Sequence, residues 1–238
     1  MRILAIDTAS AQCSAALLTE QGTSERSLPT ARDHARLILP MVDALLVEAG
    51  TTLRQLDGIA FGRGPGSFTG LRVAASVTQG LALGADLPVR PVSDLRALAE
   101  QARRRAGGEG SGLGPGPGPD LVLACMDARM GEVYWALFPL NDGRIGEAES
   151  AERVGPPDAL LNAFTGQPLL AAGLGMAAYP QIAERLGIVP GRCFADAEPH
   201  ARDIAELARM DLAAGADWLE AAAAQPVYVR DDVARVQG

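Results

Sequence analysis

Runs of apolar residues divide the chain into short strands and longer helices. Residues 2–8 and 12–19 are largely apolar, which is typical of buried strands, and a more polar strand is predicted over residues 23–28. A helix is predicted over residues 34–49, with Asp33 as its N-cap, because apolar residues recur there at i, i+3 and i+4. The first half continues with a strand over 56–61, a helix from Thr69 to about Gly84, a strand over 88–92 and a helix over 93–105. Its predicted order is therefore βββαβαβα.

The opening pattern returns in the second half of the chain. Residues 121–126 form an apolar strand that ends at Asp127, as the first strand ends at Asp7, and another strand over 132–138 follows. Because strand, aspartate, turn and strand occur twice, we predict a duplicated lobe. The remaining predicted elements are a turn at 141–143, a short helix near 156–164, a strand over 168–172 and helices near 178–186, 200–214 and 217–224.

A segment rich in glycine and proline separates the halves. Residues 107–119 contain seven glycines and three prolines, and they have too few apolar side chains to form a packed core. We therefore predict an α/β protein with an N-terminal lobe over 1–106, a flexible connector over 107–119 and a C-terminal lobe over 120–238.

Composition narrows the class of protein. The chain has 238 residues, of which 48% are apolar, so it can bury a substantial core. No apolar run reaches the length of a membrane span, and we expect an untargeted, soluble, cytoplasmic protein. Cys13, Cys125 and Cys193 are far apart in the sequence, which favours small buried side chains over a disulfide framework or a metal site. The net charge of −8 argues against tight binding of nucleic acid by this chain alone.

The strongest local signal is the glycine-rich stretch Gly62–Arg72. Its glycines allow positive φ angles and close approach of another segment, and the helix that follows could bind an anion or a partner's carbonyl at its first turn. A simple connection from strand to helix remains an alternative. The stretch does not match the dinucleotide fingerprint, because Thr69 or Ser67 stands where the third glycine should be. It does not match the lysine-containing phosphate loop either, because the chain has no lysine.

Four stretches together resemble the TsaB (YeaZ) family, the bacterial accessory subunit of the machinery that makes threonylcarbamoyladenosine beside the tRNA anticodon. They are Ile3–Thr8, Gly64–Arg72, Asp127–Tyr134 and Pro226–Arg230. This resemblance implies the two-lobed fold of actin-like and Hsp70-like ATPases, with ribonuclease H-like, duplicated βββαβα lobes.

The resemblance also implies a nucleotide cleft between the lobes. By position, the residues facing it would be Asp7, Thr8, Asp127, Gly173 and Gly175. Aspartates at strand ends also accept hydrogen bonds from turn amides, and glycine pairs also close helix connections, so a structural role for these residues remains open. ATP is expected, if at all, at this cleft or at an interface of the complex.

The catalytic paralogue in this resemblance, TsaD, carries an H-x-x-x-H pair that helps to bind a metal. The matching positions here are Asp94 and Leu98, so no metal site is expected. His34 and His200 are the only histidines, and no nucleophile stands in an activating motif. The resemblance therefore implies a protein that is not an enzyme.

The glycine-rich stretch and two helices supply the remaining candidate residues. Gly64, Gly66 and Gly70 are expected to shape the turn, Ser67 and Thr69 to cap or contact, and Arg72 to anchor the helix start or meet a partner's acid. The resemblance implies that family members pair through the helices over 34–49 and 69–84, although core packing is an alternative for each residue. The predicted interface residues are Leu37, Met41, Leu45, Val73, Ala74, Val77 and Leu81.

These observations lead to one function and two alternatives. We expect a non-catalytic accessory subunit that scaffolds TsaD, has the ATP-binding subunit TsaE as a further partner, and reaches tRNA only through the complex. We expect a homodimer when the chain is alone, and no membrane contact. The first alternative is an ATP-hydrolysing or metallopeptidase-like enzyme acting alone. The second is a regulatory homodimer outside tRNA modification.

Overall fold

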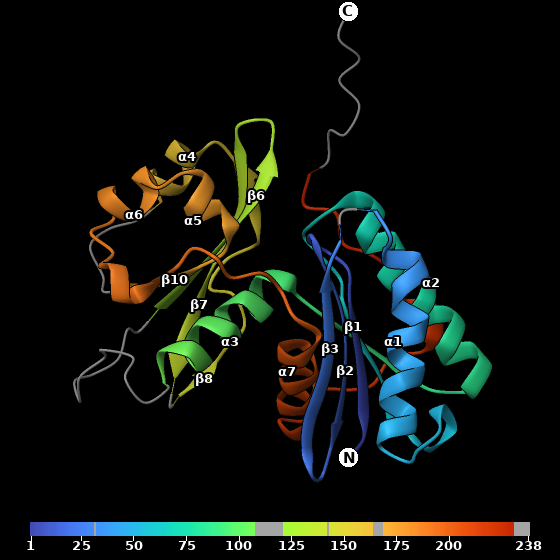
Figure 1. Ribbon diagram of the computed structural model, residues 1–238. Helices are drawn as coiled ribbons and strands as arrows, with labels where there is room; N and C mark the ends of the chain where they lie inside the picture. Colours follow the sequence, from blue (N-terminus) through green and yellow to red (C-terminus); the bar gives the residue numbers. More distant parts are fainter. Residues whose placement is uncertain (31, 108–120, 142, 164–168, 231–238) are drawn as a thin grey trace, which may run out of the picture.

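The computed structural model describes residues 1–30, 32–107, 121–141, 143–163 and 169–230. The predicted connector lies, after Gly107, outside these residues, as does Asp142 of the predicted turn. The described chain contains two β-sheets with helices on both faces of each sheet (Figure 1). None of its described helices combines the length and apolar character that a membrane span requires.

The first sheet is built from the N-terminal part of the chain. In spatial order its strands are β3 (Gly22–Pro29), β2 (Gln12–Thr19), β1 (Ile3–Asp7), β4 (Gly58–Gly62) and β5 (Val89–Val92). β1, β2 and β3 are antiparallel neighbours, whereas β4 and β5 are parallel to β1. β1 and β4 are buried at every position. Their largely apolar sequences are typical of strands that are covered by helices on both faces of the sheet.

The second sheet repeats this topology. In spatial order its strands are β11 (Cys193–Phe194), β10 (Leu169–Ala172), β6 (Leu121–Arg129), β7 (Glu132–Asn141) and β8 (Arg144–Ile145), and β9 (Arg153–Gly155) also pairs with β7. β6 and β7 are antiparallel, and β10 and β11 are parallel to β6. β9 pairs with β7 in the antiparallel sense, as β3 pairs with β2. The predicted duplication is therefore confirmed.

The helices form three layers around the two sheets (Figure 1). The outer layer of the first sheet consists of α1 (His34–Glu48) and α2 (Phe68–Ala85), and the outer layer of the second sheet consists of α4 (Pro157–Asn162), α5 (Leu174–Ala178) and α6 (Gln181–Arg185). Between the sheets lie α3 (Asp94–Ala106) and α7 (Ala201–Ala213). The apolar core is divided accordingly into one central cluster and two outer clusters.

The two inner helices are exchanged between the halves of the chain. α3 follows the last strand of the first sheet but packs on β6 and β10, whereas α7 packs on β1, β2 and β4. Arg104 of α3 and Asp203 of α7 join the helices through two hydrogen bonds of 3.0 and 3.1 Å. A division of the chain at residues 107–119 therefore separates the two sheets but not the helices that cover them.

Two predicted helices differ in the structure. The predicted helix over 217–224 is wrong, because Leu219 exchanges backbone hydrogen bonds of 2.8 and 2.9 Å with Val89, and only the 3₁₀ turn η3 (Ala221–Ala223) is helical. The alanines favour a helix, but extended residues here cover the free edge of β5. The predicted helix near 178–186 is shorter in the structure, where α6 begins at Gln181, because Pro180 disfavours helical backbone at Tyr179. The short helix α5, which ends at Ala178, was not predicted.

Other differences concern short elements and boundaries. The strand predicted to begin at residue 56 begins at Gly58, after the 3₁₀ turn η1 (Leu53–Gln55). The turn η2 (Pro190–Arg192) and strands β8, β9 and β11 were not predicted. Each contains only two or three residues, too few to show a periodic pattern.

Candidate functional site

The glycine-rich turn between β4 and α2 packs against the loop that follows β1. A Cβ atom on Gly70 would overlap the carbonyl oxygen of Thr8, and one on Gly66 would lie 2.5 Å from that of Ala9. The Ser67 N–H donates to the Ala9 carbonyl at 2.7 Å, and the Thr8 hydroxyl donates to the Gly70 carbonyl at 2.7 Å. Glycine is needed at both positions because a side chain would force the two loops apart.

The other residues of this stretch shape the start of α2. Gly64 has a φ angle of +114°, and a Cβ atom there would lie 2.6 Å from the Val227 carbonyl oxygen. Ser67 is the N-cap of α2, and its hydroxyl accepts a hydrogen bond from the Gly70 N–H at 3.4 Å. Thr69 is exposed in the first turn of the helix.

Arg72 binds residues of its own chain. Its guanidinium carbon lies 3.7 Å from the centre of the Phe68 ring, and its Nε donates to the Tyr228 hydroxyl at 3.1 Å. The Phe68 and Tyr228 rings are themselves 5.2 Å apart, centre to centre. Of the two predicted roles, the contacts of Arg72 are those of an anchor for the helix start.

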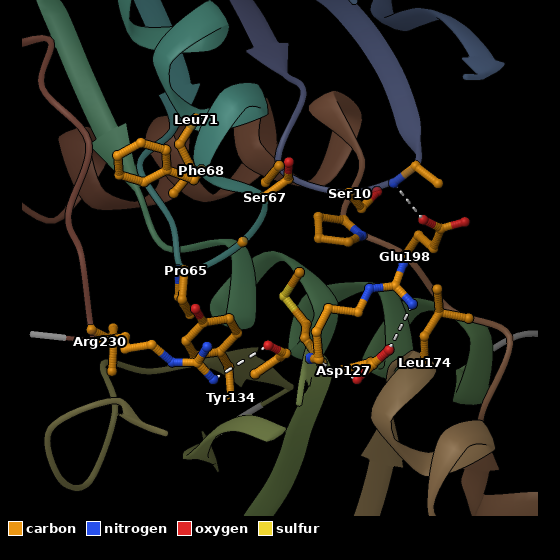
Figure 2. A pocket seen from close by; sticks show the side chains of 18 of the residues that line it. Ser10, Pro65, Ser67, Phe68, Leu71, Asp127, Tyr134, Leu174, Glu198 and Arg230 are labelled. Carbon is orange, nitrogen blue, oxygen red and sulfur yellow. Dashed lines mark hydrogen bonds and ion pairs between the residues drawn. The ribbon is translucent and has the colours of Figure 1, made fainter. Parts of the chain in front are cut away.

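A cleft of about 530 Å³ lies between this turn and the second sheet (Figure 2). One wall consists of the loop after β1, the glycine-rich turn and the start of α2. The opposite wall includes the end of β6, the start of α5 and the segment before α7, and the C-terminal residues 227–230 line one side. Its polar lining includes Ser10, Ser67, Asp127, Glu198 and Arg230.

The five predicted cleft residues do not gather in this cleft. Asp127 lines it, whereas Asp7 and Thr8 are fully buried behind its wall. A Cβ atom on Gly173 would overlap the Cys125 carbonyl oxygen, and one on Gly175 would lie 2.5 Å from the Cys125 sulfur. The two glycines therefore allow α5 to pack closely on β6, which is the structural role that the sequence left open.

Asp7 and Asp94 form a buried carboxyl pair beside Gly62. Asp7 accepts a hydrogen bond of 2.7 Å from the Ala9 N–H, and Asp94 accepts one from the Gly64 N–H. Burial raises the pKa of Asp7 to about 6, and burial together with the charge of Asp7 raises the pKa of Asp94 well above its usual range. Both shifts favour the protonated carboxyl, and the two backbone hydrogen bonds fix the glycine-rich turn and the loop after β1 to this pair.

The loop after β1 is hydrogen-bonded to Glu198 and His34. The Ala11 N–H donates to a carboxylate oxygen of Glu198 at 3.2 Å, and the Ser10 carbonyl accepts a hydrogen bond from His34 Nε2 at 3.1 Å. A phosphate site uses free backbone N–H groups and cations. Here Glu198 takes the Ala11 N–H and Asp127 adds a second carboxylate, whereas Arg129 and Arg230 are the arginines of the lining. No motif in the sequence pointed to Glu198.

Reactive groups elsewhere are buried or paired. Within the ranges that the structure describes, no group of three or more histidine, cysteine, aspartate and glutamate side chains could hold a metal ion. Burial raises the pKa of Cys13 to about 11 and that of Cys125 still further, so both thiols stay protonated at neutral pH. His200 Nδ1 lies 3.2 Å from Glu25, and Leu98 is buried in the central core.

The predicted interface residues fall into two groups. Met41, Leu45 and Ala74 are buried between the outer helices and the first sheet, so their assignment to the partner-facing surface is wrong. Apolar periodicity could not distinguish the sheet-facing side of these helices from the outer side. The remaining four are partly buried at the edge of the same cluster: Leu37, Val73, Val77 and Leu81.

The outer face of α1 and α2 carries exposed apolar residues beyond the seven predicted interface residues. Leu39, Val47 and Leu83 are 44%, 79% and 68% exposed. A Cβ atom on Gly80 or Gly84 would meet nothing within 4 Å, so α2 has open space beside these residues. Exposed large apolar side chains next to small residues are typical of a surface that another helix can approach. We call this surface the α1–α2 face.

Sequence comparisons identify relatives over nearly the whole chain. The family model of TsaD, described as tRNA N6-adenosine threonylcarbamoyltransferase, matches residues 28–236. The tRNA threonylcarbamoyladenosine biosynthesis protein TsaB of Escherichia coli K12 is 38% identical, with 98% of this chain and 96% of the relative covered. The protein of the same name from Haemophilus influenzae is 36% identical, with 98% of this chain and 95% of the relative covered.

Solved structures show the same similarity. YeaZ from Pseudomonas aeruginosa matches with a TM-score of 0.82 and 40% identity, over 95% of this chain and 99% of that chain. A second structure, described as an uncharacterized protein with similarity to peptidase YEAZ from Pseudomonas aeruginosa, has the same TM-score and identity over 96% and 99% of the two chains.

Proposed function

The chain belongs to the TsaB family of tRNA threonylcarbamoyladenosine biosynthesis proteins, and from this membership we propose that it is a non-catalytic accessory subunit in that modification. In this role it binds the catalytic paralogue TsaD and stabilises the conformation that transfers threonylcarbamoyl to the tRNA adenosine next to the anticodon. The observation that carries the proposal is the 38% identity with a TsaB protein over 98% of this chain.

The α1–α2 face supports a partner-binding role. Its exposed apolar residues Leu39, Val47 and Leu83 would lose contact with water in a complex, and each buried side chain of this size contributes about 1.5–3 kcal/mol. Gly80 and Gly84 leave room for a partner helix to pack closely. The proposal includes self-association through the same face when the paralogue is absent, and TsaE as a further partner of the complex.

The chemistry of the cleft supports an accessory role over an enzymatic one. The described residues contain no candidate metal cluster. In the loop after β1, the Ala11 N–H already donates a hydrogen bond to the Glu198 carboxylate. The net charge of −8 supports contact with tRNA through the complex. The alternative of an ATP-hydrolysing or metallopeptidase-like enzyme predicts turnover by the isolated chain, and one solved relative is described by similarity to a peptidase.

The test is formation of threonylcarbamoyladenosine on unmodified tRNA. TsaD, TsaE and threonylcarbamoyl-adenylate are supplied with and without this chain, and ATP and peptide hydrolysis by the chain alone are measured in parallel. The proposal expects modification only when the chain is present, and no turnover by the chain alone. Modification that proceeds equally well without the chain would refute it.

A matched pair of variants tests the face itself. Leu83→Glu places a charge on the exposed surface of α2, and Val189→Glu places one at a residue of the second lobe that is 54% exposed. We expect Leu83→Glu to weaken TsaD binding and self-association at least about tenfold, because burying an unpaired charge in an interface is costly. Val189→Glu should change neither. Equal affinity of both variants would show that the partner binds elsewhere.

A further inference from the structure

The last described residues of the chain run along the cleft and contact both of its walls. We call residues 226–230 the strap. On the first-lobe side, the Val227 N–H donates to the Arg63 carbonyl at 2.7 Å. The positive φ angle of Gly64 leaves space for the Val227 carbonyl, as described above. The strap is thus hydrogen-bonded to the glycine-rich turn.

The middle of the strap is attached to the first turn of α2. The Tyr228 ring packs on Phe68, and its hydroxyl accepts the hydrogen bond from Arg72. Arg72 in turn stacks on Phe68, so the three side chains contact one another in a closed set. Any displacement of Tyr228 therefore changes the contacts of the residues that begin the partner-facing helix.

The end of the strap is attached to the second lobe. Arg230 donates to the Ala128 carbonyl at 3.3 Å and forms an ion pair with Glu132, so it holds both strands of the β6–β7 hairpin. Its guanidinium carbon lies 6.0 Å from the centre of the Tyr134 ring (Figure 2). Arg230 and Glu132 are both partly buried, which strengthens their ion pair relative to one in open water.

We propose that the strap couples the position of the β6–β7 hairpin to the start of α2, and thereby regulates partner binding at the α1–α2 face. Only one residue separates Tyr228 from Arg230, and two residues of extended chain span at most about 7 Å. A hairpin that moves away from the cleft must therefore break the Arg230 contacts or pull Tyr228 from Phe68. The effect on TsaD binding rests on the proposed function, whereas the coupling within the chain does not.

Hydrogen exchange of the full chain tests the coupling. Two cutting variants weaken the second-lobe attachment from opposite sides. Arg230→Ala removes both contacts of the strap, and Glu132→Gln removes the charge of the ion pair but leaves the Ala128 hydrogen bond. The control is Arg185→Ala, which removes an exposed ion pair with Asp158 within the second lobe. We expect both cutting variants to accelerate exchange of the amides of residues 70–73 about tenfold, because opening of the first turn of α2 becomes easier. The control should leave these amides unchanged.

The same variants are then compared in TsaD binding. Arg230→Ala and Glu132→Gln should each weaken binding several-fold, and the double variant should add little, because both single changes break one attachment. Exchange in β1 and α7 reports on global stability, so a general loss of folding is distinguished from local release.

Unchanged exchange at residues 70–73 in both cutting variants would overturn the coupling. Faster exchange there with unchanged TsaD affinity would overturn the regulatory part. If wild-type chain fails to bind TsaD at all, the proposed function fails, and the exchange result still decides the coupling.

Discussion

Replacing Asp7 with asparagine should stabilise the protein at pH 8 and have little effect at pH 3.5. Asp7 is fully buried beside Asp94, and burial raises its pKa from 3.8 to about 6. A carboxyl group whose pKa is higher in the folded state binds its proton more tightly there than in the unfolded chain. Its contribution to stability is therefore complete below about pH 3.8 and is lost as the pH rises through about 6.

The size of the effect follows from the same two values. A rise from 3.8 to about 6 corresponds to about 3 kcal/mol between acid and alkaline pH. Asparagine has nearly the same shape, can accept the hydrogen bond from the Ala9 N–H and can donate to Asp94, but it does not ionise. Above pH 7 the variant should therefore unfold roughly 6–12 °C above the wild-type protein, since a domain of this size gains about 2–4 °C per kcal/mol.

Thermal unfolding followed by circular dichroism between pH 3.5 and 8.5 measures this difference. Asp43→Asn, a change at an exposed aspartate on α1, is the control and should follow the wild-type curve. All other titrating groups are shared by the two proteins, so the difference between their curves isolates the Asp7 pair. Parallel curves for Asp7→Asn and wild type, or a variant that is less stable at pH 8, would refute the reasoning.

Two further predictions concern the glycine-rich turn and His200. Gly70→Ala should destabilise the protein by about 3 kcal/mol or more, because its Cβ atom would overlap the Thr8 carbonyl. Gly80→Ala, on open helix surface, should stabilise the protein by up to about 1 kcal/mol. Equal midpoints of unfolding in urea for the two variants would contradict this prediction. The hydrogen bond to Glu25 raises the pKa of His200, so the stability that its charged form contributes is complete below about pH 6.5 and is lost as the pH rises through the raised value. His200→Gln should therefore lower the melting temperature more at pH 6 than at pH 9, and a loss that does not depend on pH would show that the ion pair contributes nothing.

The fold could be predicted largely because its strands are buried on both faces. The apolar runs 3–6 in β1 and 121–126 in β6, each followed directly by an aspartate, indicated both the sheets and their duplication. Chain position was a poor guide to packing for α7, which covers the sheet of the other half. A local sequence pattern cannot predict on which sheet a helix packs, because that packing depends on residues distant in the sequence.

The candidate site was less predictable, since its main contacts join residues that share no motif. The glycines at 66 and 70 were recognised as shaping a turn, but the loop against which they pack was not. Glu198 reaches Ala11 across 187 positions of the sequence, and Arg230 reaches Glu132 across 98. On α1 and α2 the apolar positions continue around most of each helix, so periodicity alone could not show that Met41 faces inward and Val47 outward.

The exchange of α3 and α7 between the two halves makes each half dependent on the other for its folding. A fragment that ends before residue 201 lacks the helix that covers the inner face of the first sheet, and a fragment that begins at residue 121 lacks the helix that covers the second. The repeated topology therefore does not consist of two self-sufficient domains. The two repeats form a single cooperative unit, in which neither can be removed without exposing the core of the other.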